Sequence, residues 1–159
     1  RQNSTAYCAL SPRADEELFI EFCEDFEYTP VVFTANQTVD DRREAIYHTN
    51  VMMCVAEQFA IICLAAIDDK KERKNVLKHL RETGKEVIDI TEKQVRAFAG
   101  NMLQVKGTND QQFLVMSSLA YHSLRKEQLQ KIEKYNPIIH SSLETIETCG
   151  GGSARCMMA

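Results

Sequence analysis

A glycine-rich segment that ends in a cysteine carries the clearest chemical signal in this sequence. It runs Gly150-Gly-Gly-Ser-Ala-Arg-Cys156. Consecutive glycines permit left-handed backbone torsions and let the main chain approach a ligand closely, while the neighbouring Arg155 favours the reactive thiolate. The segment predicts a nucleophilic Cys156, with Gly152 and Ser153 binding the substrate. A flexible tail with an incidental cysteine is the alternative, because a glycine-rich loop is a weak motif by itself.

His48 is the candidate acid/base partner of that thiol. It interrupts an apolar segment that we predict to be a strand, and Asn50 follows it on the same face. A neutral histidine next to a cysteine activates the thiol and carries the proton of the leaving group. A core histidine bonded to the backbone is the other interpretation. The remaining histidines have surface or structural surroundings: His79, His122 and His140.

Asn101 follows Gly100 at a predicted helix-to-strand junction, where an asparagine that forms a turn is ordinary. A similarity between three short segments supports a functional role for Asn101. In His48-Thr-Asn-Val-Met-Met53, Gly100-Asn-Met-Leu103 and Arg155-Cys-Met-Met158, a polar residue stands where a strand containing methionine is predicted to begin. Units arranged around a pseudo-axis bring such points together. We therefore predict that Asn50 and Asn101 bind the substrate beside Cys156.

The elements that must position these residues are short apolar segments and amphipathic helices. The first helix is predicted to begin at Ser11-Pro12 and to end before Pro30, with Leu18, Phe22 and Phe26 recurring every four residues. Predicted strands cover 31–34, 46–53, 59–64, 87–90, 102–105, 113–117 and 138–139. Further predicted helices cover 68–83, 91–99 and 124–135, and residues 36–44 and the tail from 141 are predicted to be irregular.

The order of these elements repeats. From Ile46 it reads strand, strand, helix, strand, and the same order starts again at Met102 after one inserted helix. The two units are offset by about 50 residues, a period that indicates a radial or solenoid architecture. The sequence therefore predicts an α/β (α+β) fold.

Length and composition are those of one soluble globular domain. The chain has 159 residues, of which 44% are hydrophobic and 26% charged, and its net charge is −4. An acidic balance without a basic stripe argues against nucleic-acid binding. No apolar run approaches the roughly 18 residues that a membrane span needs.

The six cysteines do not form a disulfide framework. Four of them stand among apolar residues and are predicted to be buried free thiols: Cys8, Cys23, Cys54 and Cys63. No CxxC pair is present, and a metal site made of His48, Cys54 and Cys63 is poorly spaced. A reducing, cytoplasmic location is the prediction that follows.

Four segments together resemble the bacterial amidinotransferase family, whose members are citrulline-utilisation hydrolases related to arginine deiminase and dimethylarginine dimethylaminohydrolase. They are Thr29-Pro-Val-Val-Phe-Thr34, Ile46-Tyr-His-Thr-Asn-Val-Met-Met53, Phe98-Ala-Gly-Asn-Met-Leu103 and Gly150-Gly-Gly-Ser-Ala-Arg-Cys-Met157. The second and fourth segments, in that order, are the specific ones. The resemblance runs from about Ala6 to the end of the sequence.

This resemblance implies a pentein fold, an α/β propeller of ββαβ units around a pseudo-five-fold axis. It also implies a mechanism without metal or organic cofactor. Cys156 attacks the central carbon of a guanidinium, His48 protonates the departing amine, and a covalent thiouronium remains. The same imidazole then activates water, which gives a ureido product.

The sequence departs from the family pattern in two ways. Related deiminases often have an aspartate where this chain has Asn50. Members are also about twice as long, and their N-terminal half supplies the acid that orients the histidine and a carboxylate that binds the guanidinium. Acidic residues near the start, Asp40, Asp41 and Glu44, lie in a predicted loop and are not assigned these roles. We therefore expect residues 1–159 to be the C-terminal part of a pentein domain, inactive without its N-terminal half.

Two other functions fit the same residues. An amidine-group transferase uses the same cysteine and histidine and differs only in its acceptor. A non-catalytic pentein that binds a partner is a different class, and the pairing of Cys156 with His48 argues against it. A homo-oligomer is possible for any of the three.

Overall fold

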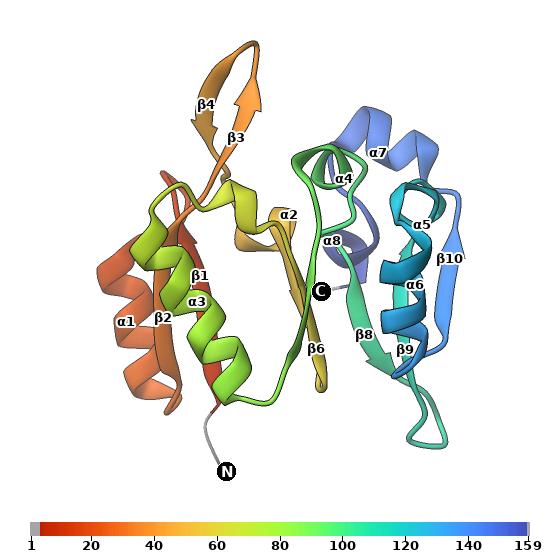
Figure 1. Cartoon of the computed structure of the whole chain (residues 1–159), viewed down its shortest axis with the longest axis horizontal. Helices are drawn as coiled ribbons and strands as arrows, with labels where there is room; N and C mark the ends of the chain where they lie inside the picture. Colours follow the sequence, from red (N-terminus) through yellow and green to blue (C-terminus); the bar gives the residue numbers. More distant parts are fainter. Residues whose placement is uncertain (1–3, 159) are drawn as a thin grey trace.

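The chain folds into small sheets interleaved with helices, as the computed structural model, which describes residues 4–158, shows (Figure 1). The strands are β1 (Thr5–Leu10), β2 (Thr29–Thr34), β3 (Asn36–Val39), β4 (Arg42–Ala45), β5 (Met53–Val55), β6 (Phe59–Ile62), β7 (Glu86–Asp89), β8 (Leu103–Lys106), β9 (Gln112–Ser117) and β10 (Ile138–Ser141). The helices are α1 (Glu16–Asp25), α2 (Thr49–Met52), the 3-10 turn η1 (Leu64–Ala66), α3 (Lys70–Glu82), α4 (Glu92–Arg96), α5 (Ser118–Ser123), α6 (Lys126–Glu133), α7 (Glu144–Gly150) and α8 (Ala154–Met158). This content agrees with the predicted α/β class.

Two units with the predicted order strand, strand, helix, strand are confirmed. Strand β5 runs antiparallel to β6, and β6 pairs in parallel with β7 across α3. Strand β8 runs antiparallel to β9, and β9 pairs in parallel with β10 across α5 and α6. Parallel neighbours need a crossover connection, and the helices supply it. Strands β1 and β2 form a further parallel pair across α1, while the closed five-fold ring stays a prediction.

The core surrounds β6, whose four residues Phe59–Ile62 are all fully buried. A strand that is covered on both faces reads as a continuous apolar run, which is why the run from Phe59 predicts this strand correctly. Helix α3 packs Val76 and Leu80 into the same cluster. The core therefore joins the first ββαβ unit to its neighbours and leaves the loops between elements free to carry the site.

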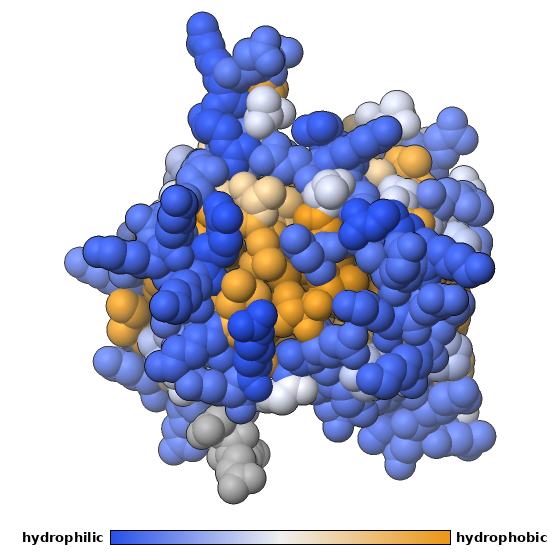
Figure 2. Space-filling view, viewed as in Figure 1, coloured by the Kyte–Doolittle hydropathy of each residue, from blue (hydrophilic) through white to orange (hydrophobic). Residues whose placement is uncertain are grey.

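The surface is mostly hydrophilic. Figure 2 shows an apolar area at the centre of one face, where β6 and β7 pass between α3 and α6. Leu18 of α1 and the C-cap residue Phe26 are 66% and 63% exposed, whereas Cys23 of the same helix is buried. The apolar four-residue repeat of α1 therefore lies on the surface of residues 4–158. Within this part of the chain, none of the helices combines the length and the apolar character needed to span a bilayer.

The first helix begins later than predicted. Asp15, rather than Ser11, is its N-cap, and the Asp15 side chain accepts a hydrogen bond from the Leu18 N–H. Ser11 instead closes a turn with Ala14, and its hydroxyl donates to the carbonyl oxygen of Tyr47. Serine and aspartate are both good N-caps. Because the Ser11 hydroxyl is bonded to the distant Tyr47, Asp15 is the residue that caps the helix.

The predicted loop over residues 36–44 is a regular hairpin of β3 and β4, which projects from the top of the molecule in Figure 1. Its two-residue turn consists of Asp40 and Asp41, both with positive φ (45° and 59°). Positive φ at both central residues defines a type I′ turn, which matches the twist of paired strands. The prediction was wrong because the hairpin is too polar to show an apolar alternation.

The segment that contains His48 and the tail that contains the glycine-rich loop also differ from the prediction. Only the end of the 46–53 run is a strand, because His48 is the extended N-cap of α2. The Thr49 hydroxyl of that turn accepts a hydrogen bond from the Ala9 N–H of β1. The tail is not irregular, since it forms α7 and α8, and Cys156 lies on α8 rather than at the start of a strand.

Candidate active site

One pocket collects most of the predicted site residues. Its volume is about 160 Å³, and Cys156, His48, Asn50, Asn101 and Gly152 all line it. The rest of the lining includes Gln37, Tyr47, Val51, Val95, Arg96 and Phe98. Loops and helix ends from distant parts of the chain therefore meet here, as the repeat argument predicted, although the elements that carry them differ from the prediction.

The thiol of Cys156 is exposed, and side-chain amides face it. Asn101 Nδ2 lies 3.2 Å from Cys156 Sγ, and Asn50 Nδ2 lies 3.9 Å from it. The Cys156 N–H in turn donates to Asn101 Oδ1 at 3.4 Å. Amide donors at these distances stabilise negative charge on a sulfur. Asn101 therefore holds both the backbone and the sulfur of the candidate nucleophile.

Asn101 is positioned by a close approach of two backbones. Its side chain is buried, and its Nδ2 also donates to the Asn50 carbonyl oxygen at 3.2 Å. A Cβ on the preceding Gly100 would lie 2.3 Å from the Val51 carbonyl oxygen and 2.8 Å from Met52 Cα. Only glycine lets α2 rest against this chain segment. The sequence predicted the asparagine but not the need for this glycine.

His48 lies in the same pocket as Cys156 on extended backbone, with φ −139° and ψ 139°. Its ring is exposed and packs edge-on against Tyr47, with ring centroids 5.0 Å apart. Within residues 4–158 no side chain makes a hydrogen bond to this ring. Within the described chain the imidazole is therefore packed against Tyr47 but is not oriented by a hydrogen bond, which is the role that the family resemblance assigns to an acid elsewhere.

Asn50 carries a polar atom that the described residues do not satisfy. Its Oδ1 is buried and has no hydrogen-bond partner within residues 4–158. Buried side-chain oxygens nearly always have a partner, so an exception calls for an explanation. At the edge of a pocket, an unpaired acceptor beside a thiol marks a place for an N–H donor.

The glycine-rich loop is divided between the pocket and the interior. A Cβ on Gly152 would lie 3.4 Å from Cys156 Sγ, so this glycine keeps the space beside the thiol open. Ser153, which we predicted to bind substrate, is fully buried instead, and its hydroxyl donates to Glu147 Oε1 at 2.6 Å. The Arg155 guanidinium donates to a backbone carbonyl oxygen of β5 at 3.3 Å. The structure therefore does not bring Ser153 to the pocket.

The other cysteines differ from Cys156 in their burial. Cys8, Cys23, Cys54 and Cys63 are buried free thiols, as predicted. Burial raises the pKa of Cys54 to about 11, although the charge of Arg155 opposes the shift. Burial also raises the pKa of Cys63 to about 11. Among the cysteines only Cys149 and Cys156 are exposed.

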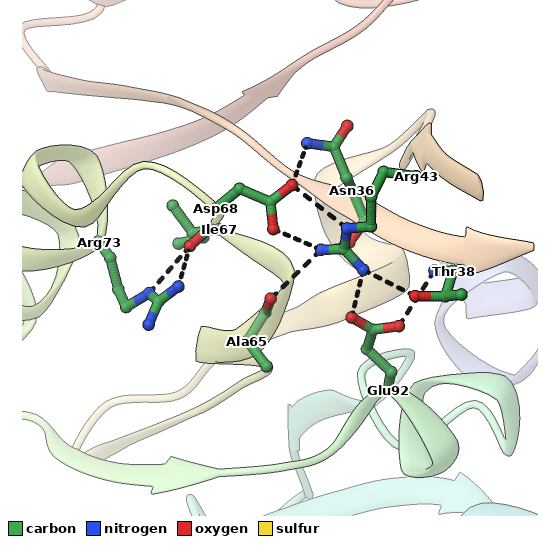
Figure 3. A network of polar contacts seen from close by, with 8 residues as sticks. All are labelled: Asn36, Thr38, Arg43, Ala65, Ile67, Asp68, Arg73 and Glu92. Carbon is green, nitrogen blue, oxygen red and sulfur yellow. Dashed lines mark hydrogen bonds and ion pairs between the residues drawn. The ribbon is translucent and has the colours of Figure 1, made fainter. Parts of the chain in front are cut away.

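Arg43 of β4 holds the polar hairpin against the rest of the molecule, a role that the sequence did not reveal (Figure 3). Its guanidinium pairs with Asp68 at 2.6 Å and with Glu92. It also donates to the Thr38 hydroxyl and to the Asn36 carbonyl oxygen. Asp68 precedes α3 and Glu92 opens α4. One side chain thus connects the hairpin, which carries Gln37 of the pocket, to the helix that carries Val95 and Arg96.

The protonation of this cluster follows its contacts. The Arg43 hydrogen bond holds the pKa of Asp68 below its usual value, against a smaller effect of partial burial. Partial burial raises the pKa of Glu92, but hydrogen bonds from Arg43 and Thr38 outweigh it and the net shift is downward. Both carboxylates are therefore ionised at neutral pH and remain so in mild acid.

The pocket lining among residues 4–158 holds no aspartate or glutamate. In the same part of the chain, no group of three or more His, Cys, Asp or Glu side chains is arranged to hold a metal ion. The chemistry that this lining offers on its own is therefore nucleophilic attack by sulfur, proton transfer by an imidazole and hydrogen bonding by amides.

Solved structures of similar shape include arginine dihydrolases from cyanobacteria. Apo ArgZ, an arginine dihydrolase from the ornithine-ammonia cycle, matches with a TM-score of 0.67 and 16% identity, over 95% of this chain and 21% of that one. The N-terminal domain of ArgZ bound to its product matches with a TM-score of 0.66 and 15% identity, over 95% and 49%. AgrE in complex with L-arginine matches with a TM-score of 0.68 and 16% identity, over 99% and 21%. The chain thus spans about a fifth to a half of these proteins.

These likenesses show that the fold is similar to that of part of the ArgZ N-terminal domain. No curated protein sequence matches the chain. The model of one protein family does match it, over residues 1–159, and the family is described as N,N dimethylarginine dimethylhydrolase, eukaryotic. The sequence resemblance pointed to bacterial relatives of the same enzymes, and a bacterial origin stays a prediction. The match over the whole sequence shows that the chain belongs to the N,N-dimethylarginine dimethylhydrolase family.

Proposed function

We propose that the protein containing this chain hydrolyses a carbon–nitrogen bond of an arginine-like guanidino compound, with Cys156 as nucleophile and His48 as acid and base. The observation that carries the proposal is the contact of 3.2 Å between Asn101 Nδ2 and the exposed Cys156 Sγ, in a pocket that His48 also lines. The family match supports the same class of substrate.

The reaction divides into two steps. The Cys156 thiolate forms a bond to the guanidino carbon, and the bond from that carbon to one nitrogen breaks as His48 gives that nitrogen a proton. The amine leaves and a thiouronium remains on the sulfur. His48 then accepts a proton from water, whose oxygen bonds to the carbon, and the carbon–sulfur bond breaks to return the thiolate. The products are an amine and a ureido compound.

The amides supply hydrogen bonds along this path. Asn101 and Asn50 stabilise the negative charge of the sulfur before attack. The unpaired Asn50 Oδ1 is an acceptor suited to a guanidinium N–H, and Gly152 leaves room for the planar carbon beside the thiol. Ser153 acts indirectly in this account, since it ties the loop to Glu147.

A carboxylate is still needed to balance the charge of a bound guanidinium. A buried cation without a partner is costly, and the pocket lining within residues 4–158 contains no acidic residue. We therefore propose that the guanidinium-binding carboxylate and the acid that orients His48 come from another part of the protein, and that residues 1–159 alone do not turn over substrate.

Turnover of the whole protein tests the proposal. Arginine and N-methylated arginines are incubated with wild type and with three variants, and the ureido product is measured. We expect Cys156→Ala to abolish product formation and His48→Gln to lower it by about 10²–10⁴-fold. Cys149→Ala, which removes the other exposed thiol, should leave the rate unchanged. Equal rates in wild type and Cys156→Ala would refute the proposal, and an amidino group transferred to an added amine would favour the transferase instead.

A further inference from the structure

Phe98 has a backbone conformation that does not suit it. Its φ is +60°, in the left-handed region. A bulky residue with an L side chain is a true outlier there, because Cβ approaches the carbonyl oxygen. Such strain persists only where the surrounding structure imposes it, and it is concentrated at functional sites. The reason for a phenylalanine at this position must therefore lie in its side chain.

The end of α4 explains the conformation. The Phe98 N–H donates to the Val95 carbonyl oxygen, and the Ala99 N–H donates to that of Gln94, both at 2.9 Å. This pair of bonds is a Schellman motif, whose left-handed position is usually glycine. The Phe98 carbonyl oxygen then accepts from the Asn101 N–H at 2.9 Å. The motif turns the chain directly toward the amide that contacts Cys156.

Two other helices of the chain end with the same motif and provide a comparison. Helix α3 has Gly84 at the left-handed position, with φ +74°, and the Lys85 N–H donates to the Leu80 carbonyl oxygen. Helix α1 has the exposed Glu27 there, with φ +57°. Neither Gly84 nor Glu27 lines the site pocket. Of these three left-handed positions, one has glycine and one an exposed glutamate, and the aromatic ring stands at the one that lines the pocket.

Phe98 lines two cavities. It lines the pocket of about 160 Å³ that contains Cys156, and it lines a neighbouring cavity of about 450 Å³. Leu119, Leu143 and Thr148 form part of the wall of that second cavity. Phe98 is the one residue of the described chain that belongs to both linings. The smaller space and the larger one therefore adjoin at Phe98.

We propose that Phe98 is a specificity-determining residue that limits the size of the substrate, by closing the pocket beside Cys156 against the adjoining cavity. This inference rests on the proposed function for its substrate class, namely guanidino compounds with no substituent or a small one on the reacting group. The strained backbone is the cost of this wall, and a larger substituent is excluded because Phe98 is the residue that the two linings share within residues 4–158.

A labelling experiment on the whole protein tests the wall without requiring turnover. The probes are 2-chloroacetamidine, whose amidinium resembles a guanidinium, and its N-benzyl derivative. In both, the thiolate bonds to the carbon that loses chloride, and a thioether forms. The rate at Cys156 is followed by mass spectrometry in wild type, in Phe98→Gly and in Glu27→Gly. Glycine suits a positive φ, so Phe98→Gly keeps the turn that positions Asn101, and Glu27→Gly makes the same backbone change away from the pocket.

We expect the ratio of N-benzyl rate to parent rate to rise by at least about tenfold in Phe98→Gly, since pockets reject an oversized group by one to two orders of magnitude. The ratio should not change in Glu27→Gly. An unchanged ratio in Phe98→Gly would overturn the inference. If that variant does not fold, Phe98→Asn serves in its place, because asparagine tolerates the left-handed region, and the same ratio decides. Failure of the proposed function would show differently, as labelling of Cys156 no faster than Cys149 in the wild type.

Discussion

At the scale of the residue, the candidate site depends on how the six thiols differ in burial, in pKa and in their contacts. Burial raises the pKa of four of them, and it brings Cys54 and Cys63 to about 11. Cys149 and Cys156 are exposed, and only Cys156 lies in the pocket beside two amides. Exposure selects two candidates, and the contact with Asn101 distinguishes one of them.

These differences between the thiols predict the order in which they are alkylated. With iodoacetamide at pH 8, we expect Cys149 and Cys156 to react in the native protein and Cys54 and Cys63 to react only after denaturation, because the thiolate is the nucleophile. Peptide mapping by mass spectrometry measures each rate. Rapid native alkylation of Cys54 would contradict the account.

Burial also favours the neutral thiols of Cys54 and Cys63 in the folded protein. The contribution of their raised pKa values to the free energy of unfolding is therefore complete below about pH 9 and is lost as the pH rises toward about 11.

Asn101→Leu tests the amide at the sulfur. The variant removes the donor at 3.2 Å, and a hydrogen bond to a charged group is worth about 1.5–3 kcal/mol. We expect the alkylation of Cys156 to slow by about tenfold or more, since each 1.4 kcal/mol is a factor of ten. Cys149 in the same molecule is the internal control, because it lies outside the pocket. Equal slowing at both cysteines would indicate a change in the fold and no specific role for the amide.

At the scale of the element, two contacts between elements shape the pocket. Gly100 lets α2 lie against the start of β8, which places Asn50 and Asn101 together. Arg43 ties the β3–β4 hairpin to α4 (Figure 3). Gln37 of the hairpin and Arg96 of α4 line the same pocket. Neither contact involves a residue that performs chemistry, and both are open to substitution.

Gly100→Ala should disturb the site from within the fold. The added methyl would meet the Val51 carbonyl oxygen at 2.3 Å, and the backbone of α2 must move to relieve the clash. We expect a loss of about 1–3 kcal/mol in the free energy of unfolding, as overpacking typically causes, together with slower labelling of Cys156. Urea denaturation measures the first effect. Gly150→Ala is the matched control, since its Cβ meets nothing within 4 Å, and a similar loss there would refute the reasoning.

Arg43→Gln should loosen the hairpin in a manner that depends on pH. The lowered pKa values of Asp68 and Glu92 mean that the ion pairs stabilise the fold above the unfolded pKa of a carboxyl group, near 4, and that this contribution is lost as the pH falls through the folded values. The difference in melting temperature between wild type and variant should therefore be full at pH 6–8 and shrink below about pH 4. Arg42→Gln, which alters the neighbouring exposed arginine, should show no such difference. A gap between wild type and Arg43→Gln that is independent of pH would contradict the prediction.

The sequence predicted the elements whose signals are local and strong. The apolar run of β6, the charged helix α3 with Gly84 after it, and the capping box at Thr91 all agree with the structure. The polar hairpin, α7 and α8 were missed because they are short and lack an apolar period. The candidate site residues were predicted from residue types and from similar local segments, and the roles of these residues stay predictions. Their geometry could not be predicted, because His48 and Cys156 lie at short helices that are held by the distant contacts of Thr49 and Ser153.

At the scale of the whole molecule, the described chain carries only part of the proposed site. The candidate nucleophile, the imidazole and the amides line the pocket, while the lining within residues 4–158 has no carboxylate. The chain spans 49% of the ArgZ N-terminal domain that it matches. An exposed apolar stripe also runs along α1 to its C-cap, formed by Leu18, Phe22 and Phe26, and such a stripe is typical of a surface that another part of a protein or a partner covers. Homo-oligomerisation stays a prediction.

The mass of the enzyme during turnover shows whether Cys156 forms a covalent intermediate. The whole protein is mixed with arginine or a methylated arginine, quenched in acid within a turnover and digested with trypsin, which cleaves after Arg155 and so puts Cys149 and Cys156 on different peptides. The account predicts an adduct on the Cys156 peptide whose mass is that of the substrate less the departing amine. Steady turnover with no adduct at Cys156, and with an undiminished rate in Cys156→Ala, would contradict it.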